Sequence, residues 1–215
     1  EKAFGILQRE RVIMTGSSRT DAGVHALQNF FHFDFEGAVH PQFLYKINAI
    51  LPQDIVIQSI RKVGEEAHCR FDATGREYRY YIYQKKDPFL RDRAFYFPYK
   101  LDLEIMQQGA ELVKSYHDFT SFSKRNTQVK SFICQIAHSE WYREGDCLVY
   151  RVVANRFLRG MVRALTATML KLGRQKIDLD DFSAVIEAKD CRVASFAVPP
   201  HGLFLVRVNY PPGLL

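Results

Sequence analysis

Apolar positions in the first part of the chain fall alternately at helical and at strand spacing. Residues 3–7 carry apolar side chains three and four positions apart, which predicts the end of an amphipathic helix. Runs over residues 11–15 and 27–35 predict strands, and residues 43–51 predict a helix that ends before a proline. Residues 55–63 then predict a third strand, so the expected order is α-β-β-α-β.

The remaining two thirds of the chain repeat this order with one more strand at the start. The predicted elements are a strand over 77–83, a helix over 105–113, a hairpin of 131–142 and 146–154, a helix over 157–172, a short helix over 180–188 and a strand over 203–210. Without the short helix, this order is β-α-β-β-α-β, the split βαβ arrangement.

The two parts therefore predict an α+β protein made of two pseudo-repeated, ferredoxin-like halves. The N-terminal half covers residues 1–67 and the C-terminal half covers residues 68–215. No flexible linker separates them, so we expect one mainly antiparallel sheet with helices on one face. The first half lacks its leading strand, which we expect before Glu1, because the chain begins within a predicted helix and without an initiator methionine.

Composition limits the class of protein. The apolar fraction of 47% and the charged fraction of 25% are those of an ordinary soluble domain, and no apolar run approaches the length of a membrane span. Four scattered cysteines without a C-x-x-C pair are typical of reduced thiols. The seven histidines show no zinc spacing. We therefore expect a cytoplasmic protein that binds no metal and no membrane.

The formal net charge of +6 is concentrated in two regions. Residues 151–176 hold seven basic side chains and no acidic one: Arg151, Arg156, Arg159, Arg163, Lys171, Arg174 and Lys176. A second basic region, residues 70–93, is interleaved with aromatic side chains. Cations mixed with aromatics suit the phosphate backbone and the unstacked bases of RNA. A solvated surface beside ordinary strand aromatics explains the pattern equally well.

Residues 15–26, Thr-Gly-Ser-Ser-Arg-Thr-Asp-Ala-Gly-Val-His-Ala, are the most distinctive polar stretch. They place Asp21 on a loop between two predicted strands, where a rigid frame leaves a side chain open to a ligand. Ser17 and Ser18 can bind an anion or orient the carboxylate, and Arg19 would favour the ionised form that a nucleophile requires. The simpler alternative is a polar turn in which Asp21 bonds its own backbone.

Three further patterns carry candidate chemistry. Alternation in the strand over 77–83 sends Tyr78 to the face opposite Arg79, where its ring could stack on a base or simply pack in the sheet. Arg156, Arg159 and Arg163 lie at i, i+3 and i+7 of a predicted helix, as a basic stripe that could bind RNA or be solvated. Residues 117–124 suit a helix-ending turn or a phosphate-holding loop.

Together these segments resemble the tRNA pseudouridine synthase A family. The string from Gly16 to Ala26 matches the catalytic motif of that family and is highly specific. The other matching segments, in the order of the family, are Arg76-Glu77-Tyr78-Arg79-Tyr80, His117-Asp118-Phe119 through Phe122, Asn155-Arg156-Phe157-Leu158 through Met161-Val162-Arg163, and Gly202-Leu203-Phe204-Leu205. The resemblance spans nearly the whole chain, apart from Ser18 and Ala167, which stand where many members carry glycine.

The resemblance implies an enzyme that isomerises uridine to pseudouridine in the anticodon arm of tRNA, as a homodimer and without a cofactor. Asp21 corresponds to the nucleophile, Arg19 to its neighbouring arginine, Tyr78 to the active-site tyrosine and Arg163 to the arginine that pairs with the carboxylate. The residues expected to contact the RNA are Ser17, Ser18, His25, Arg76, Arg79, His117, Asp118, Lys124, Arg156 and Arg159.

Two other functions fit parts of the pattern. A catalytically silent RNA-binding protein of the same fold would keep the basic and aromatic residues but would not need Asp21. A phosphate-binding hydrolase that uses residues 16–18 would need a helix directly after that loop and a cluster of metal-binding carboxylates. The sequence shows neither, so the RNA-modifying isomerase is the favoured interpretation.

Overall fold

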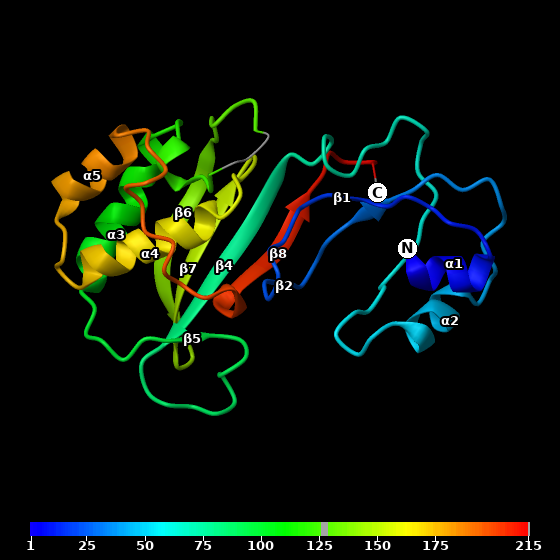
Figure 1. Cartoon of the computed structure of the whole chain (residues 1–215), viewed down its shortest axis with the longest axis horizontal. Helices are drawn as coiled ribbons and strands as arrows, with labels where there is room; N and C mark the ends of the chain where they lie inside the picture. The colour runs from blue at the N-terminus through cyan, green and yellow to red at the C-terminus, as the bar shows by residue number, and fades with distance from the viewer. Residues whose placement is uncertain (126–128, 215) are drawn as a thin grey trace. The chain divides into compact units, whose positions relative to one another are not determined.

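The computed structural model describes residues 1–125 and 129–214 (Figure 1). The chain forms two compact units, and both are discontinuous in the sequence. The smaller unit contains Glu1–Ser18, Phe30–Ala73 and Tyr210–Leu215, and the larger unit contains Arg19–Asn29 and Thr74–Asn209. The sequence predicted two halves, 1–67 and 68–215, as repeats of one order of elements rather than as compact units. That division stays a prediction.

The smaller unit packs two helices over a small apolar core. Helices α1 (Lys2–Gln8) and α2 (Phe43–Ile50) lie where the apolar spacing predicted them, and α2 ends before the proline. The buried core residues are Phe4, Val12, Phe43 and Ile47. The ring of Phe4 makes an edge contact with that of Phe43 at 5.4 Å between centroids. Burial of these aromatic side chains is the main stabilising contribution to this unit.

The strands predicted in this part of the chain are mostly wrong in extent. Only β1 (Thr15–Gly16) and β3 (Phe31–His32) pair, as a two-stranded antiparallel sheet. No strand forms over residues 55–63, all of which the structure describes. At Ile57 the backbone is bonded by a side chain instead, since Asn48 accepts from the Ile57 amide at 2.8 Å and donates to its carbonyl at 2.9 Å. Backbone groups satisfied by a side chain need no neighbouring strand.

The larger unit is built on a six-stranded sheet that is mainly antiparallel, as predicted. The prediction of one sheet shared by both halves is wrong, because β1 and β3 form a separate two-stranded sheet. Its strands are β2 (His25–Ala26), β4 (Gly75–Tyr83), β5 (Phe95–Tyr96), β6 (Ile136–Glu144), β7 (Cys147–Ala154) and β8 (Leu203–Asn209). Their order is β2-β8-β4-β7-β6, with β5 beside β4. The pairs β4–β7, β4–β8 and β6–β7 are antiparallel, whereas β2–β8 and β4–β5 are parallel.

Helices cover one face of this sheet. They are α3 (Leu103–Leu112), α4 (Met161–Gly173) and α5 (Leu179–Glu187), and α5 packs on the other two (Figure 1). Trp141 of β6 fixes both inner helices, because its indole N–H contacts Met169 Sδ on α4 at 3.1 Å and its amide donates to Gln107 of α3. Short 3-10 helices η1 (Val113–Ser115), η2 (Thr120–Phe122) and η3 (Pro200–Gly202) complete the unit.

The start of α4 differs from the prediction. The helix begins at Met161, and Gly160 before it has φ of 77°, in the left-handed region that a right-handed helix cannot include. Arg156 and Arg159 therefore precede the helix, and the expected three-arginine stripe keeps only Arg163 on α4. The first strand of the hairpin also begins later, at Ile136. The other predicted elements of this unit lie within a few residues of their predicted bounds, whereas β2, β5 and the 3-10 helices were not predicted.

No helix in residues 1–125 or 129–214 is both long enough and apolar enough to cross a bilayer.

Candidate active site

Asp21 lies in a tight turn that the sheet of the larger unit holds in place. Its carbonyl accepts a hydrogen bond from the Val24 amide at 3.1 Å, and Gly23 between them has φ of 80°, as the third residue of a type II turn requires. A Cβ on Gly23 would lie 3.0 Å from Pro200 Cγ, so η3 packs directly against the turn. The following residue pair forms β2, where His25 pairs with Phe204 of β8.

Three cationic side chains surround the Asp21 carboxylate. Lys124 Nζ lies 3.0 Å from Oδ2, Arg163 Nη1 lies 3.6 Å from the same oxygen, and Arg159 Nε lies 3.5 Å from Oδ1. The Asp21 side chain is 22% exposed, whereas those of Arg163 and Arg159 are 16% and 62% exposed. The carboxylate is therefore half-enclosed by positive charge and still open on one side.

These contacts fix the protonation state of Asp21. Burial alone would raise the pKa of this carboxyl, but the hydrogen bond and charge of Lys124 and the charge of Arg159 outweigh it. The resulting pKa is lower than the ordinary value of 3.8. Asp21 is thus ionised at neutral pH, as a nucleophilic carboxylate must be.

Arg163 is held in position by the backbone carbonyl of Val198. Its Nε and Nη2 donate to the Val198 carbonyl at 3.0 and 2.6 Å, which leaves Nη1 directed at Asp21. The residue lies in the first turn of α4, where the backbone amides carry partial positive charge that also favours a nearby anion. The ion pair between Arg163 and Asp21 that the family resemblance implied is present in the structure.

Tyr78 and Tyr80 share the face of β4 that the helices cover. Tyr78 is 8% exposed, and its ring meets that of Phe157 edge-on at 5.1 Å between centroids. Tyr80 is fully buried and donates from its hydroxyl to the Pro199 carbonyl at 2.7 Å. Burial raises the pKa of Tyr80 far above its ordinary value, against the opposing charge of Arg163. Tyr80 lies two positions after Tyr78, so alternation along the strand places both on one face. Nothing in the sequence indicated that Tyr80 has a role at the site.

Arg19 and His25 flank Asp21 in the sequence without touching its carboxylate in the described part of the chain. Arg19 is exposed, and the cations that contact Asp21 are Lys124, Arg159 and Arg163. The expectation that Arg19 ionises Asp21 is therefore corrected. His25 stacks on Phe204 at 4.5 Å and contacts the Asp92 carbonyl through Nε2, so its ring fastens β2 to the sheet.

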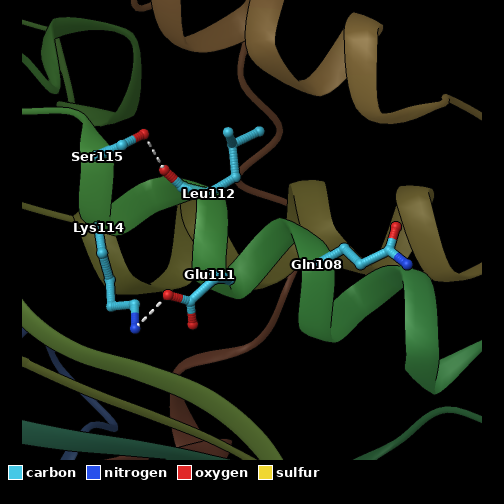
Figure 2. A pocket seen from close by; sticks show the side chains of 5 residues that line it. All are labelled: Gln108, Glu111, Leu112, Lys114 and Ser115. Carbon is cyan, nitrogen blue, oxygen red and sulfur yellow. Dashed lines mark hydrogen bonds and ion pairs between the residues drawn. The ribbon is translucent and has the colours of Figure 1, made fainter.

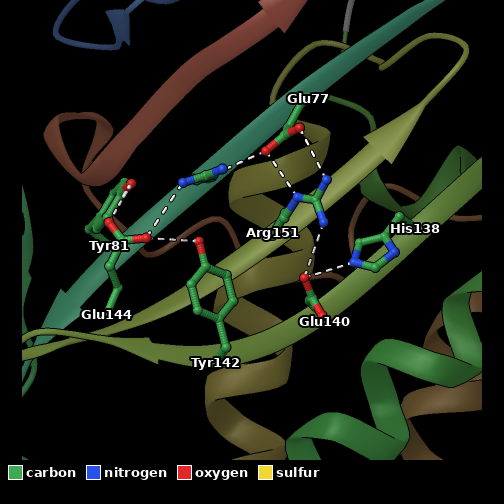
Figure 3. A network of polar contacts seen from close by, with 8 residues as sticks. Glu77, Tyr81, His138, Glu140, Tyr142, Glu144 and Arg151 are labelled. Carbon is green, nitrogen blue, oxygen red and sulfur yellow. Dashed lines mark hydrogen bonds and ion pairs between the residues drawn. The ribbon is translucent and has the colours of Figure 1, made fainter.

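Several residues expected to contact RNA have structural partners. Arg76 is buried and donates to the Asn155 carbonyl at 2.9 Å. Arg79 lies on the opposite face of β4, in an ionic network with Glu77 and Glu144 (Figure 3). Asp118 accepts from the amide and hydroxyl of Thr120 and forms an ion pair with Lys189.

The last four expected contacts are distributed over both units. Ser17 and Ser18 belong to the smaller unit, where Ser17 is buried and accepts from the Phe30 amide at 3.3 Å. His117 is exposed and accepts from the Cys134 amide through its carbonyl. Arg156 is half-buried beside Asn155, whose side chain accepts from its amide at 2.8 Å.

Comparison with known sequences identifies the family. A sequence model of a family described as tRNA pseudouridine synthase matches residues 116–211. Proteins named tRNA pseudouridine synthase A from Parabacteroides distasonis and Bacteroides fragilis are 47% and 43% identical over 213 residues, which is 98% of this chain and 84% of each relative. A protein of the same name from Bacillus licheniformis is 38% identical over 215 residues, 98% of this chain and 87% of that protein. By this similarity the chain belongs to the tRNA pseudouridine synthase A family.

Proposed function

We propose that this chain isomerises uridine to pseudouridine in tRNA with Asp21 as the nucleophile. Membership of the family makes the chain a pseudouridine synthase, an enzyme that moves uracil from an N1 to a C5 linkage. The observation that supports the role of Asp21 is its carboxylate, held ionised between Lys124, Arg159 and Arg163 on a rigid turn. A silent RNA-binding protein would gain nothing from an acidic group at the centre of its cations, because that group repels phosphate.

The reaction follows from the chemistry of a single carboxylate. A uridine within a stem or loop must first leave its stack and enter a pocket. Asp21 then attacks either the uracil ring or the sugar C1′, and the N1–C1′ bond breaks. The uracil turns and C5 bonds to C1′, and the Asp21 carboxylate is released, either displaced from C1′ by C5 or eliminated from the ring. Loss of the C5 proton restores the ring while N1 takes up a proton. No atom is gained or lost and the steps are only nucleophilic attack and proton transfer, so we propose that the carboxylate performs the reaction without a cofactor.

Three other side chains have proposed roles in this sequence. Arg163 holds the carboxylate in position, for which its contact to Asp21 and its anchoring to Val198 are the support. Tyr78 forms a wall of the base pocket, on the sheet face that also carries the phenol of Tyr80. Arg19, which is exposed, fills the gap in the RNA that the flipped base leaves.

The proposal also covers where the enzyme acts and how its chain is arranged. The basic residues near the site, with Arg159 as the most exposed of the three at Asp21, support binding to the anticodon arm. In the C-terminal part, the order β4-α3-β6-β7-α4-β8, apart from β5, α5 and the 3-10 helices, supports a ferredoxin-like half, and four free cysteines support a cytoplasmic location. We propose a homodimer, as the family resemblance implies. A monomeric mass in light scattering, at working concentrations of enzyme, would contradict this part.

Mapping pseudouridine in tRNA tests the proposed activity and its substrate together. Unmodified tRNA transcripts incubated with the purified protein are read by pseudouridine-specific chemistry, with protein-free transcripts as the control. We expect new pseudouridine at one or more uridines of the anticodon arm. Modification elsewhere would contradict the proposed substrate position, and binding without modification would favour the silent RNA-binding protein.

A further inference from the structure

Lys124 makes the shortest of the three ion pairs to Asp21, at 3.0 Å. The segment before it is firmly anchored, because Phe119 directly before η2 and Phe122 at its end are fully buried. Ser123 is 1% exposed, and its hydroxyl contacts the Lys124 carbonyl. The position of Lys124 is thus determined by the core of the larger unit rather than by a free loop.

The backbone and the side-chain stem of Lys124 are both held against the start of α4. Its amide donates to the Arg159 carbonyl at 3.0 Å. A Cβ on Gly160 would lie 3.1 Å from Lys124 Cγ and 3.3 Å from its Cε, closer than such atoms normally approach. The absence of a side chain at Gly160 therefore leaves the space through which the lysine stem reaches Asp21.

The two oxygens of Asp21 are held differently. Oδ2 contacts Lys124 and Arg163, whose side chains are 35% and 16% exposed. Oδ1 contacts Arg159, which is 62% exposed, so little packing opposes its turning toward an RNA phosphate. Oδ2 is thus held by two anchored cations, and Oδ1 contacts an exposed one.

We propose that Lys124 is a positioning residue that fixes Oδ2 of Asp21 together with Arg163, so that Oδ1 is the oxygen presented to the substrate. This proposal rests on the proposed function of Asp21 as the nucleophile. It also changes the expected role of Lys124, which sequence reasoning assigned to the RNA. Here its ammonium group is engaged by the carboxylate, and Arg159 is the cation that the substrate draws away.

The charged groups around Asp21 determine how the removal of Lys124 changes the dependence of the reaction rate on pH. Lys124, Arg159 and Arg163 contact the carboxylate, and the packed η3 carries His201 beside Pro200. Without Lys124, the anchored Arg163 and the exposed Arg159 remain. The pKa of Asp21 then rises, a smaller fraction is ionised at acidic pH, and the acid limb of the rate profile moves to higher pH.

The test compares Lys124→Met, Lys124→Gln and Lys124→Arg with a matched control, Lys114→Met. The Lys114 side chain is 32% exposed and is ion-paired with Glu111 on α3, so it resembles Lys124 in exposure and charge environment (Figure 2). Single-turnover rates of pseudouridine formation are measured between about pH 3 and 8, a range that includes the acid limb of Asp21, with tRNA affinity and thermal stability measured in parallel.

We expect Lys124→Met and Lys124→Gln to slow the single-turnover rate about tenfold or more and to move the acid limb up by about one pH unit. Affinity for tRNA should stay within about twofold, Lys124→Arg should recover most of the rate, and Lys114→Met should behave as wild type. Lys124→Gln keeps a hydrogen-bond donor without the charge, so it carries the test even if the methionine variant fails to fold.

Three results would overturn the assignment. Weakened tRNA binding with an unchanged rate and acid limb would make Lys124 an RNA contact. Wild-type behaviour of both neutral variants would leave it without a role, and a loss that Lys124→Arg does not recover would indicate packing rather than charge. Activity of an Asp21→Asn variant would instead disprove the role of Asp21 as the nucleophile. This variant therefore distinguishes a failure of the proposed function from a failure of the role proposed for Lys124.

Discussion

At the scale of single residues, the chemistry of this site depends on contacts between distant parts of the chain. Lys124 and Asp21 are 103 positions apart in the sequence and 3.0 Å apart in the structure. The motif around Asp21 identified the candidate nucleophile, and the family resemblance identified Arg163 as its partner. Neither identified Lys124 or Arg159 as a partner, because the cation that reaches a carboxylate is determined by the tertiary fold. Arg19, the nearest arginine in the sequence, was the wrong choice.

Tyr78 offers a test of whether its ring or its hydroxyl matters. Tyr78→Phe keeps the ring, so we expect near-normal tRNA binding, and the loss of single-turnover rate measures the contribution of the hydroxyl. Tyr78→Ala removes a side chain that is 8% exposed and packs on Phe157, which should cost about 3–4 kcal/mol in the free energy of unfolding. Denaturant unfolding and single-turnover kinetics measure the two effects separately.

A buried tyrosine elsewhere on the same sheet face is the control. Tyr150 is fully buried, and its hydroxyl contacts the Ser139 hydroxyl at 3.0 Å. Tyr150→Phe should lower the free energy of unfolding by about 1 kcal/mol and leave the rate unchanged. Full activity in both Tyr78 variants would remove this residue from the active site.

At the scale of elements, hydrophobic spacing predicted the helices and the long strands but not the short ones. Strand β4 and helix α3 bury side chains along most of their length. Their apolar residues therefore recur regularly in the sequence, and this spacing predicted both elements. The segment over 55–63 has a strand-like pattern but forms no strand, and at Ile57 its backbone is bonded by the side chain of Asn48. The first residue of α4 depended on the backbone angle at Gly160, which composition does not show.

The open face of the sheet carries an ionic network that links β4, β6 and β7 (Figure 3). Glu77 lies at its centre, with Arg79 Nε at 3.0 Å and Arg151 Nε at 2.9 Å. Arg151 continues the network to Glu140, which also contacts His138. Burial would raise the pKa of Glu77, but its hydrogen bonds from Arg151 and Arg79 hold that pKa below the ordinary value of 4.5.

This network predicts a pH-dependent loss of stability on Glu77→Gln. Because the pKa of Glu77 is lowered in the folded state, its stabilising contribution is present above pH 4.5 and disappears as the pH falls through the folded value. We expect a loss of about 2 kcal/mol in the free energy of unfolding at neutral pH, because two half-buried arginines lose their partner. The difference from wild type should shrink below about pH 4 in urea titrations.

An exposed ion pair provides the matched control for Glu77. Glu111 is 64% exposed and pairs with Lys114 on the surface of α3. Glu111→Gln should change the free energy of unfolding by less than about 0.5 kcal/mol at any pH. A Glu77→Gln penalty that stays the same from neutral to acidic pH would show that packing, rather than the charge, accounts for it.

At the scale of the whole molecule, the sequence predicted the class of fold and the family more securely than the arrangement of its parts. The mainly antiparallel sheet and the helices on it follow from the order of elements. The division into two discontinuous compact units does not, because it depends on the pairing of β2 with β8 across the length of the chain. That pairing brings the turn of Asp21 into the larger unit, where Lys124 and the first turn of α4 complete its surroundings.

Tritium release from tRNA that carries 5-³H-uridine tests the role of Asp21 most directly, because formation of the new bond displaces the C5 hydrogen. Wild type and Asp21→Asn are compared on the same tRNA, with binding measured in parallel. We predict release by wild type, none by Asp21→Asn, and affinities for tRNA within about threefold of each other, because the substitution removes the nucleophile and leaves the surrounding cations in place. Release by Asp21→Asn at the wild-type rate would contradict a nucleophilic Asp21, and no release by either protein on bound tRNA would contradict the isomerase itself.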